Sequence, residues 1–203
     1  MKNKLTLITL LLTGGLAYAQ TMGSFTDARN GQTYKTVSYE DPLLGAKITI
    51  MAENLNYKIA GSYAYDDNEQ YRKNLGLLYT WEAAMKACPS GWHLPSDSEW
   101  SRLIELIGSE DTVGYAMKSI KGWVENGNYG NGTNSSGFNA ISAGSRYDDG
   151  TFYGIGVGGY FWSSTEGVES SAWGRSLSYD SSEASRSSYG SKGYAFSCRC
   201  VRD

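Results

Sequence analysis

The sequence is short of the residues on which most active sites depend. Its 203 residues include one histidine, three cysteines and three prolines. Any Ser-His-Asp or Cys-His centre would have to use His93, and a histidine that fixes a turn or lines the core is the more common role. A zinc site built on clustered His and Cys is not supported, because there is no second histidine and no Cys-x-x-Cys spacing. We therefore expect a non-catalytic chain with no obligatory metal or cofactor.

Basic clusters and long apolar runs are also scarce. Eighteen Lys and Arg face 21 Asp and Glu, which gives a formal net charge of -3 and disfavours nucleic acid as a partner. After residue 19, no apolar run is long enough to span a bilayer. The composition thus predicts neither a nucleic-acid-binding protein nor a membrane-spanning one.

The N-terminus has the pattern of a secretory signal peptide. Lys2 and Lys4 precede an apolar stretch over residues 5–12, and Ala17-Tyr18-Ala19 provides a small-x-small cleavage site. The mature chain is predicted to begin at Gln20. This predicts export, with periplasmic, cell-surface and extracellular locations all left open.

Two helices are predicted around a proline. Trp81, Ala84, Met85 and Cys88 are spaced to share one helical face, and Pro89 ends that helix. A second helix begins after it, at an S-x-x-E capping box. This box and the predicted buried face of the second helix comprise Ser96, Glu99, Trp100, Leu103, Ile104 and Ile107. Residues 112–120 are predicted to form a shorter third helix.

Strands dominate the rest of the chain. Residues 20–30 read as a flexible leader, residues 32–39 and 46–51 as a hairpin, and residues 54–74 as a surface loop. The turn residues Asp148-Asp149-Gly150 punctuate a further hairpin, and more extended runs follow to the C-terminus. Helices early and antiparallel hairpins late predict one α+β domain.

Three cysteines in an exported chain predict one disulfide and one free thiol. Cys198 and Cys200 lie two residues apart in the last strand and share a face, so only one of them can pair with Cys88. The residues themselves leave both pairings open.

Several phrases of this sequence resemble a known family. YKTV, MAENLNY, LYTW, ACPSGWHLPSDSEW, GFNAISAGSR, YFWSSTE and CRCVRD, in this order, resemble the Fibrobacter succinogenes major paralogous domain over residues 31–203. More distantly they resemble the C-type lectin-like fold and its formylglycine-generating-enzyme branch. That resemblance implies a C-type lectin-like α+β fold, and it implies a disulfide between Cys88 and Cys200, because the first-helix cysteine of that fold commonly joins the last strand.

Aromatic residues in the late loops suggest a binding function, since flat rings stack on sugars and polar neighbours bond their hydroxyls. A tryptophan within a strand, however, more often belongs to the core. The expected function is a secreted recognition module that binds glycan or a cell-surface protein. The alternatives are a structural or assembly protein of the envelope and, from the resemblance, an oxidase that uses Cys198 and Cys200. The predicted ligand-binding residues are Trp123, Tyr129, Arg146, Tyr153, Tyr160, Trp162 and Glu166.

Overall fold

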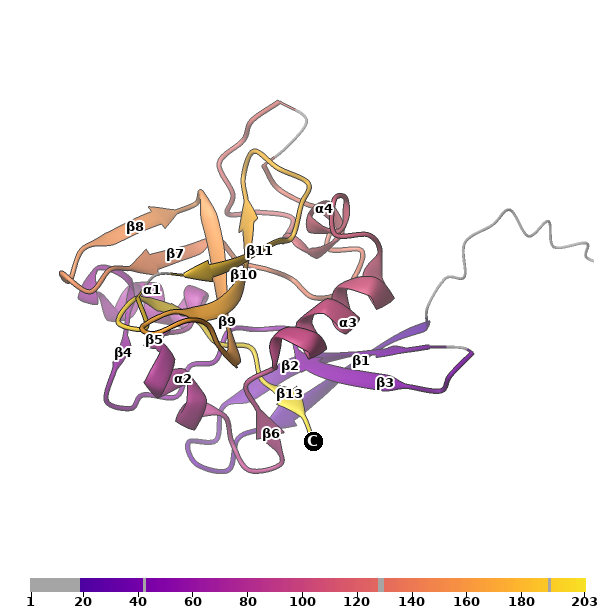
Figure 1. Cartoon of the computed structure of the whole chain (residues 1–203), viewed down its shortest axis with the longest axis horizontal. Coiled ribbons are helices and arrows are strands. Elements are labelled where there is room, and N and C mark those ends of the chain that lie inside the picture. Colours follow the sequence, from indigo (N-terminus) through magenta and orange to yellow (C-terminus); the bar gives the residue numbers. More distant parts are fainter. Residues whose placement is uncertain (1–18, 42, 128–129, 190) are drawn as a thin grey trace, which may run out of the picture.

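The computed structural model describes residues 19–41, 43–127, 130–189 and 191–203. In this part of the chain, two β-sheets combine with four α-helices, which confirms the α+β class (Figure 1). The predicted signal peptide, apart from its last residue, lies outside the described residues.

The first sheet combines strands from both ends of the chain. Its order is β1 (Ala19–Thr26), β2 (Thr33–Glu40), β3 (Lys47–Met51), β13 (Val201–Arg202) and β6 (Trp92–His93). All of its pairings are antiparallel. The predicted β2–β3 hairpin is therefore confirmed.

Strand β1 corrects the expectation of a flexible leader over residues 20–30. It pairs with β2 along its whole length, and the Phe25 ring lies 4.9 Å from the Trp92 ring, centroid to centroid. A tight turn follows, in which Asp27 accepts hydrogen bonds from Arg29. The polar stretch from Gln20 to Ser24 shows little of the apolar alternation that marks a strand, so hairpin pairing rather than local pattern orders it.

The second sheet holds the late strands predicted from the sequence. Most neighbouring strands in this sheet are antiparallel, but β9 runs parallel to both β7 and β12. The C-terminal half of the chain is therefore not a simple series of hairpins. Strand β8 pairs with β7 beside the main path. The order is β11 (Ser185–Tyr189), β10 (Ala172–Ser178), β9 (Gly158–Glu166), β7 (Ala143–Arg146), β12 (Ala195–Ser197), β5 (Leu78–Thr80) and β4 (Ser62–Tyr63), with β8 at Phe152–Ile155.

The three predicted helices are present as α2 (Trp81–Ala87), α3 (Asp97–Ile107) and α4 (Val113–Met117). The capping box of α3 is complete, with both the Ser96 and Glu99 side chains bonded to backbone N–H groups. None of the helices in the described part of the chain has the length and apolar character to cross a membrane.

The predicted buried faces of α2 and α3 are only partly right. Met85 is exposed, while Ala83 and Ala87 are buried beside the predicted Ala84. In α3, Leu106 is fully buried, whereas Ile107 packs at the edge of the core.

Residues 54–74 are more ordered than the predicted surface loop. They contain β4, a 3-10 turn (Tyr65–Asp67) and most of helix α1 (Glu69–Leu75). No residue of α1 is buried, and its sequence lacks the apolar periodicity by which helices are recognised. Its start is fixed by Asn68, whose side chain accepts a hydrogen bond from the Gln70 N–H.

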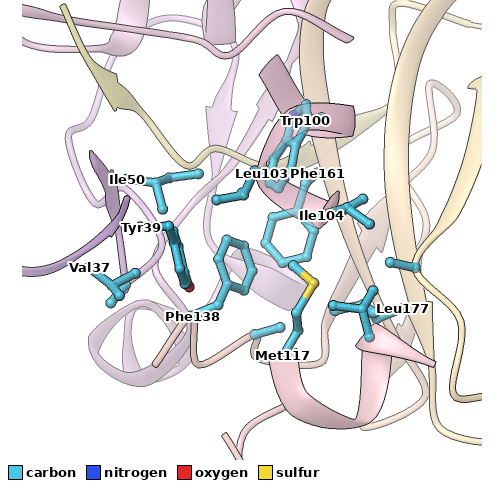
Figure 2. Packing of buried hydrophobic residues seen from close by; sticks show 14 of the residues in the cluster. Val37, Tyr39, Ile50, Trp100, Leu103, Ile104, Met117, Phe138, Phe161 and Leu177 are labelled. Atoms are coloured by element: carbon cyan, nitrogen blue, oxygen red, sulfur yellow. The ribbon is translucent and has the colours of Figure 1, made fainter. Parts of the chain in front are cut away.

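The main core lies between α3 and the two sheets. Trp100 and Leu103 of α3 pack with Tyr39 of β2 and Phe161 of β9, and Phe138 closes the cluster from a loop (Figure 2). The Trp100, Phe138 and Phe161 rings lie 5.7 to 5.9 Å apart, centroid to centroid. Helix α3 thus joins the sheets through a shared aromatic cluster.

A second cluster contains the disulfide. Cys88, just after α2, is bonded to Cys200 in the last segment of the chain, as the resemblance implied. Cys198 is a buried free thiol.

Candidate functional site

Two of the predicted ligand-binding residues are core residues. Trp162 is 0% exposed, its Nε1 donates to the Tyr79 carbonyl at 2.9 Å, and its ring lies 4.3 Å from that of Phe196. Trp123 is 4% exposed, and its Nε1 donates to Ser119 Oγ at 3.0 Å. The prediction that these tryptophans offer open stacking faces is therefore wrong, because their rings and their N–H groups are used inside the fold.

Tyr160 and Glu166 do not form a common binding site with these tryptophans. Tyr160 is half-buried, with its ring stacked on Phe196 at 5.3 Å. Glu166 is exposed at the end of β9, where it forms an ion pair with Lys192. Tyr129 lies outside the described residues.

Arg146 and Tyr153, in contrast, lie together on the β7–β8 hairpin. Tyr153 is 50% exposed, and its ring lies 4.7 Å from that of Tyr147, which is 39% exposed. Tyr147 also stacks on Tyr194 at 4.7 Å, with the two planes only 18° apart. We call Tyr147, Tyr153 and Tyr194 the tyrosine cluster. Tyr147 and Tyr194 were not among the residues predicted from the sequence, although Tyr147 directly follows Arg146.

Arg146 packs beside this cluster and contacts the backbone of Tyr147. Its guanidinium lies 4.0 Å from the centre of the Tyr63 ring, and its Nη1 donates to the Tyr147 carbonyl at 3.2 Å. The buried Nε has no hydrogen-bond partner among the described residues. Arg146 is thus held by stacking and by one backbone contact, and it fixes the base of the hairpin turn.

The turn beside the cluster carries two carboxylates. Gly150 takes a left-handed conformation with φ of +94°, and the Asp149 carboxylate accepts hydrogen bonds from the Thr151 hydroxyl and N–H at 2.5 and 2.9 Å. These bonds lower the pKa of Asp149. Asp148 accepts from Ser191 Oγ at 3.1 Å, which ties the turn to the segment that carries Tyr194. The result is an ordered surface of tyrosine rings with carboxylates at its rim.

Comparison with protein families places the chain. The family model of the Fibrobacter succinogenes major domain matches residues 25–202. The chain belongs to this family. The match begins at residue 25, within the segment expected to be a flexible leader and now seen as β1. No curated protein and no solved structure matches the chain.

The histidine of this Fibrobacter succinogenes major domain is engaged on both sides. His93 Nε2 lies 2.8 Å from Glu99 Oε1, and Nδ1 lies 2.6 Å from Asp203 Oδ1. Burial alone would lower the pKa of His93, but the hydrogen bonds to the two carboxylates outweigh it and raise the pKa. His93 therefore joins β6 to α3 and to the C-terminal residue, and neither ring nitrogen is free in this geometry to act as a base.

The three cysteines of the domain form one sulfur group. Their Sγ atoms all lie within 4.8 Å of one another, and Cys198 Sγ is 3.9 Å from each of the bonded sulfurs. Two of the three are consumed by the disulfide. Burial raises the pKa of the Cys198 thiol to about 12, so the reactive thiolate is strongly disfavoured at neutral pH.

Proposed function

We propose that this domain is an exported, non-catalytic recognition module that binds glycan through the tyrosine cluster. One observation carries the proposal: Tyr147 and Tyr153 keep 39% and 50% of their surface exposed, although their rings are fixed by mutual packing. A pre-ordered aromatic surface loses little side-chain entropy when a sugar ring stacks on it. Asp148 and Asp149, which follow Tyr147 along the chain, are exposed and carry carboxylates that suit sugar hydroxyls. Export rests on the signal-peptide pattern of residues 1–19.

A C-type lectin-like fold is part of the same proposal. Two features support it: the Cys88–Cys200 disulfide joins the helix α2 to the end of the chain, and α3 packs against strands from both sheets. The late strands and their hairpins then occupy the region in which such folds present their ligand-binding loops.

A second candidate function is assembly within the cell envelope through protein contacts. The burial of Trp123 and Trp162 removes two sugar-stacking platforms from the predicted set, which favours this alternative. In addition, Ile155 and Val157, which follow Tyr153 along the chain, are 36% and 38% exposed. Apolar side chains of this kind suit a protein partner better than a hydrated polysaccharide.

Two surface variants test the proposal. Tyr147→Ala and Tyr153→Ala remove exposed rings, and Tyr115→Ala is the matched control, because Tyr115 is a 42% exposed tyrosine on α4, away from the hairpin. We expect glycan-array and cell-wall polysaccharide binding by the wild type and the control. Loss of one stacked ring should weaken binding by about ten-fold, with the melting temperature little changed.

The outcomes separate the two functions. If the wild type binds no polysaccharide but captures an envelope protein, and if Tyr153→Ala abolishes that capture, the assembly function replaces glycan binding. Equal binding by Tyr147→Ala, Tyr153→Ala and the control would remove the tyrosine cluster from either function.

Trp162→Ala gives a contrasting result. Because Trp162 is fully buried and bonded to β5, its loss should destabilise the fold by about 3–5 kcal/mol, measured by urea unfolding. A variant that lost binding at unchanged stability would instead return Trp162 to the binding surface.

A further inference from the structure

A polar groove lies apart from the residues of the tyrosine cluster. It consists of two hollows, of about 290 and 550 Å³, that share Asn74, Leu75, Asn139 and Ile141 and so meet. The C-terminal half of α1 and the residues just after it form one side, and segments 119–122 and 134–141 form the other. The combined space lies within the size range of small-molecule sites. We call it the asparagine groove.

Two amides of this groove turn their oxygens toward the protein. Asn56 Oδ1 accepts from Arg72 Nε at 2.5 Å, and Asn134 Oδ1 accepts from the Asn139 N–H at 2.7 Å. The Nδ2 groups of Asn56 and Asn134 have no partner in the described part of the chain. The side chains of Asn74 and Asn139 have none there either. Asn56 and Asn134 therefore present hydrogen-bond donors to the groove, while Asn74 and Asn139 present both a donor and an acceptor.

Its charged side chains are mostly cationic. Arg72, Lys73 and Lys121 line the groove with one carboxylate, Glu53, although the chain as a whole has a net charge of -3. Arg72 is already paired with Glu69 at 3.1 Å, so the two lysines are the cations left for a ligand. One Glu53 oxygen is already occupied by the Lys35 N–H at 2.7 Å. Lys73 and Lys121 are exposed and form no ion pair among the described residues. Because Lys73 lines one hollow and Lys121 the other, the positive charge is spread along the groove.

A buried cation stands behind the groove floor. Arg199 is 0% exposed and donates to Asn54 Oδ1 at 2.7 Å and to the Asn139 carbonyl at 2.9 Å, and both of these residues line the groove. No carboxylate contacts Arg199 within salt-bridge distance in the described residues. Glu53, which lines the groove, acts on this charge through space without contacting it, so Arg199 still adds positive potential to the floor.

We propose that the asparagine groove binds an acidic oligosaccharide whose sugar units carry carboxylates. The free Nδ2 groups of Asn56 and Asn134 and the two lysines suit carboxylate and hydroxyl oxygens, and the distribution of these donors over two hollows suits a ligand with repeated negative charges. Leu75, Ile120 and Ile141 supply apolar surface for the C–H faces of sugar rings. This site is independent of the glycan-binding surface proposed at the tyrosine cluster.

The test uses oligogalacturonate and oligoguluronate as probes, measured by calorimetry with the full chain. A neutral cello-oligosaccharide of equal length controls for charge, and polyglutamate represents an acidic peptide. The double variant Lys73→Glu/Lys121→Glu reverses two groove charges, whereas Lys47→Glu reverses an exposed lysine on β3, outside the groove. Asn139→Gly removes one amide and retains the positive φ of +54° at that position.

We expect the wild type and Lys47→Glu to bind at least one uronate oligosaccharide, more weakly as salt increases. The double variant should bind about ten-fold more weakly and Asn139→Gly about three-fold more weakly, while Tyr153→Ala binds normally. The proposal is overturned if no uronate oligosaccharide binds, or if the double variant matches Lys47→Glu. Stronger binding of polyglutamate than of either uronate probe would reassign the groove to an acidic peptide.

Discussion

At the scale of single residues, Arg199 is a fully buried side chain that is held by four hydrogen bonds. Besides its bonds to Asn54 and Asn139, its Nη1 donates to the Met51 and Phe138 carbonyls at 3.0 and 2.8 Å. Its guanidinium also lies 4.7 Å from the centre of the Phe138 ring. Burial lowers the pKa of Arg199 to about 9, which expresses the cost of placing this charge in the interior. The four bonds to oxygen offset that cost.

Replacing this side chain should therefore be severe. Arg199→Met keeps much of the volume but leaves three backbone carbonyls and the Asn54 oxygen without their donor. We expect the free energy of unfolding to fall by about 3–5 kcal/mol in urea titrations, because each unpaired buried carbonyl costs about 1 kcal/mol or more. Arg202→Met, at an exposed arginine three residues later, should change it by less than about 0.5 kcal/mol. Similar stability for the two variants would contradict this account.

Only some of the ligand-binding residues predicted from the sequence lie on the surface of the structure, and others lie in the core. Arg146 and Tyr153 were predicted because aromatic and polar residues in the late loops suit sugar binding, and both lie beside a hairpin turn. Trp162 was misjudged because β9 is covered on both faces, where Phe161 is 1% and Trp162 0% exposed, and strand alternation cannot reveal this. Tyr194 joins the cluster only through tertiary packing on Tyr147, which no local pattern records.

At the scale of elements, local chemistry decides what the sequence can predict. Helix α3 was predicted with its start because the capping box and the apolar face both lie within the helix and its cap. Helix α1 and strand β1 were missed because neither has an apolar pattern of its own. The first is exposed along its length, and the second is ordered by pairing with β2.

The cap of α3 also predicts a pH dependence, through His93. Glu99 serves the capping box with one carboxylate oxygen and contacts His93 with the other. Because the folded-state pKa of His93 is raised, its protonated form stabilises the fold. That stabilisation is complete below the unfolded pKa of about 6.5 and is lost as the pH rises through the higher folded value. With 42% of the His93 side chain exposed, solvent screening limits it to less than about 1 kcal/mol.

The difference between wild type and His93→Gln isolates this contribution. Both proteins are unfolded in urea at pH 6 and at pH 9. At each pH, the contributions of the other titrating groups cancel in the difference between the two free energies of unfolding. We expect the wild-type advantage to shrink toward zero at pH 9, and to shrink at pH 6 when 0.5 M salt is added. An advantage that stays constant with pH would show that His93 acts by packing rather than by charge.

At the scale of the whole molecule, the last residues of the chain connect the two sheets. Strand β12 belongs to the second sheet and β13 to the first, and between them lie Cys198, Arg199 and Cys200. The Cys198 carbonyl accepts from the Leu55 N–H at 2.9 Å, and that of Cys200 accepts from the Met51 N–H at 3.0 Å. The sequence predicted an α+β domain but not this arrangement, because β13 pairs with strands more than a hundred residues earlier in the chain.

The Cys88–Cys200 disulfide holds this connection in place. We expect its removal to lower the stability of the whole domain. The disulfide closes a separation of 112 residues, so Cys88→Ala/Cys200→Ala should lower the free energy of unfolding by about 4–5 kcal/mol in the chain-entropy model. In that variant Cys198 is the one cysteine left and cannot form another disulfide within the chain, and in the native protein it should not exchange with the Cys88–Cys200 bond. Its sulfur is equally far from both bonded sulfurs and thus lies beside the bond, whereas exchange requires attack in line with it. Mass mapping of the non-reduced native protein should therefore recover Cys88 only with Cys200, and a Cys88–Cys198 peptide would contradict this.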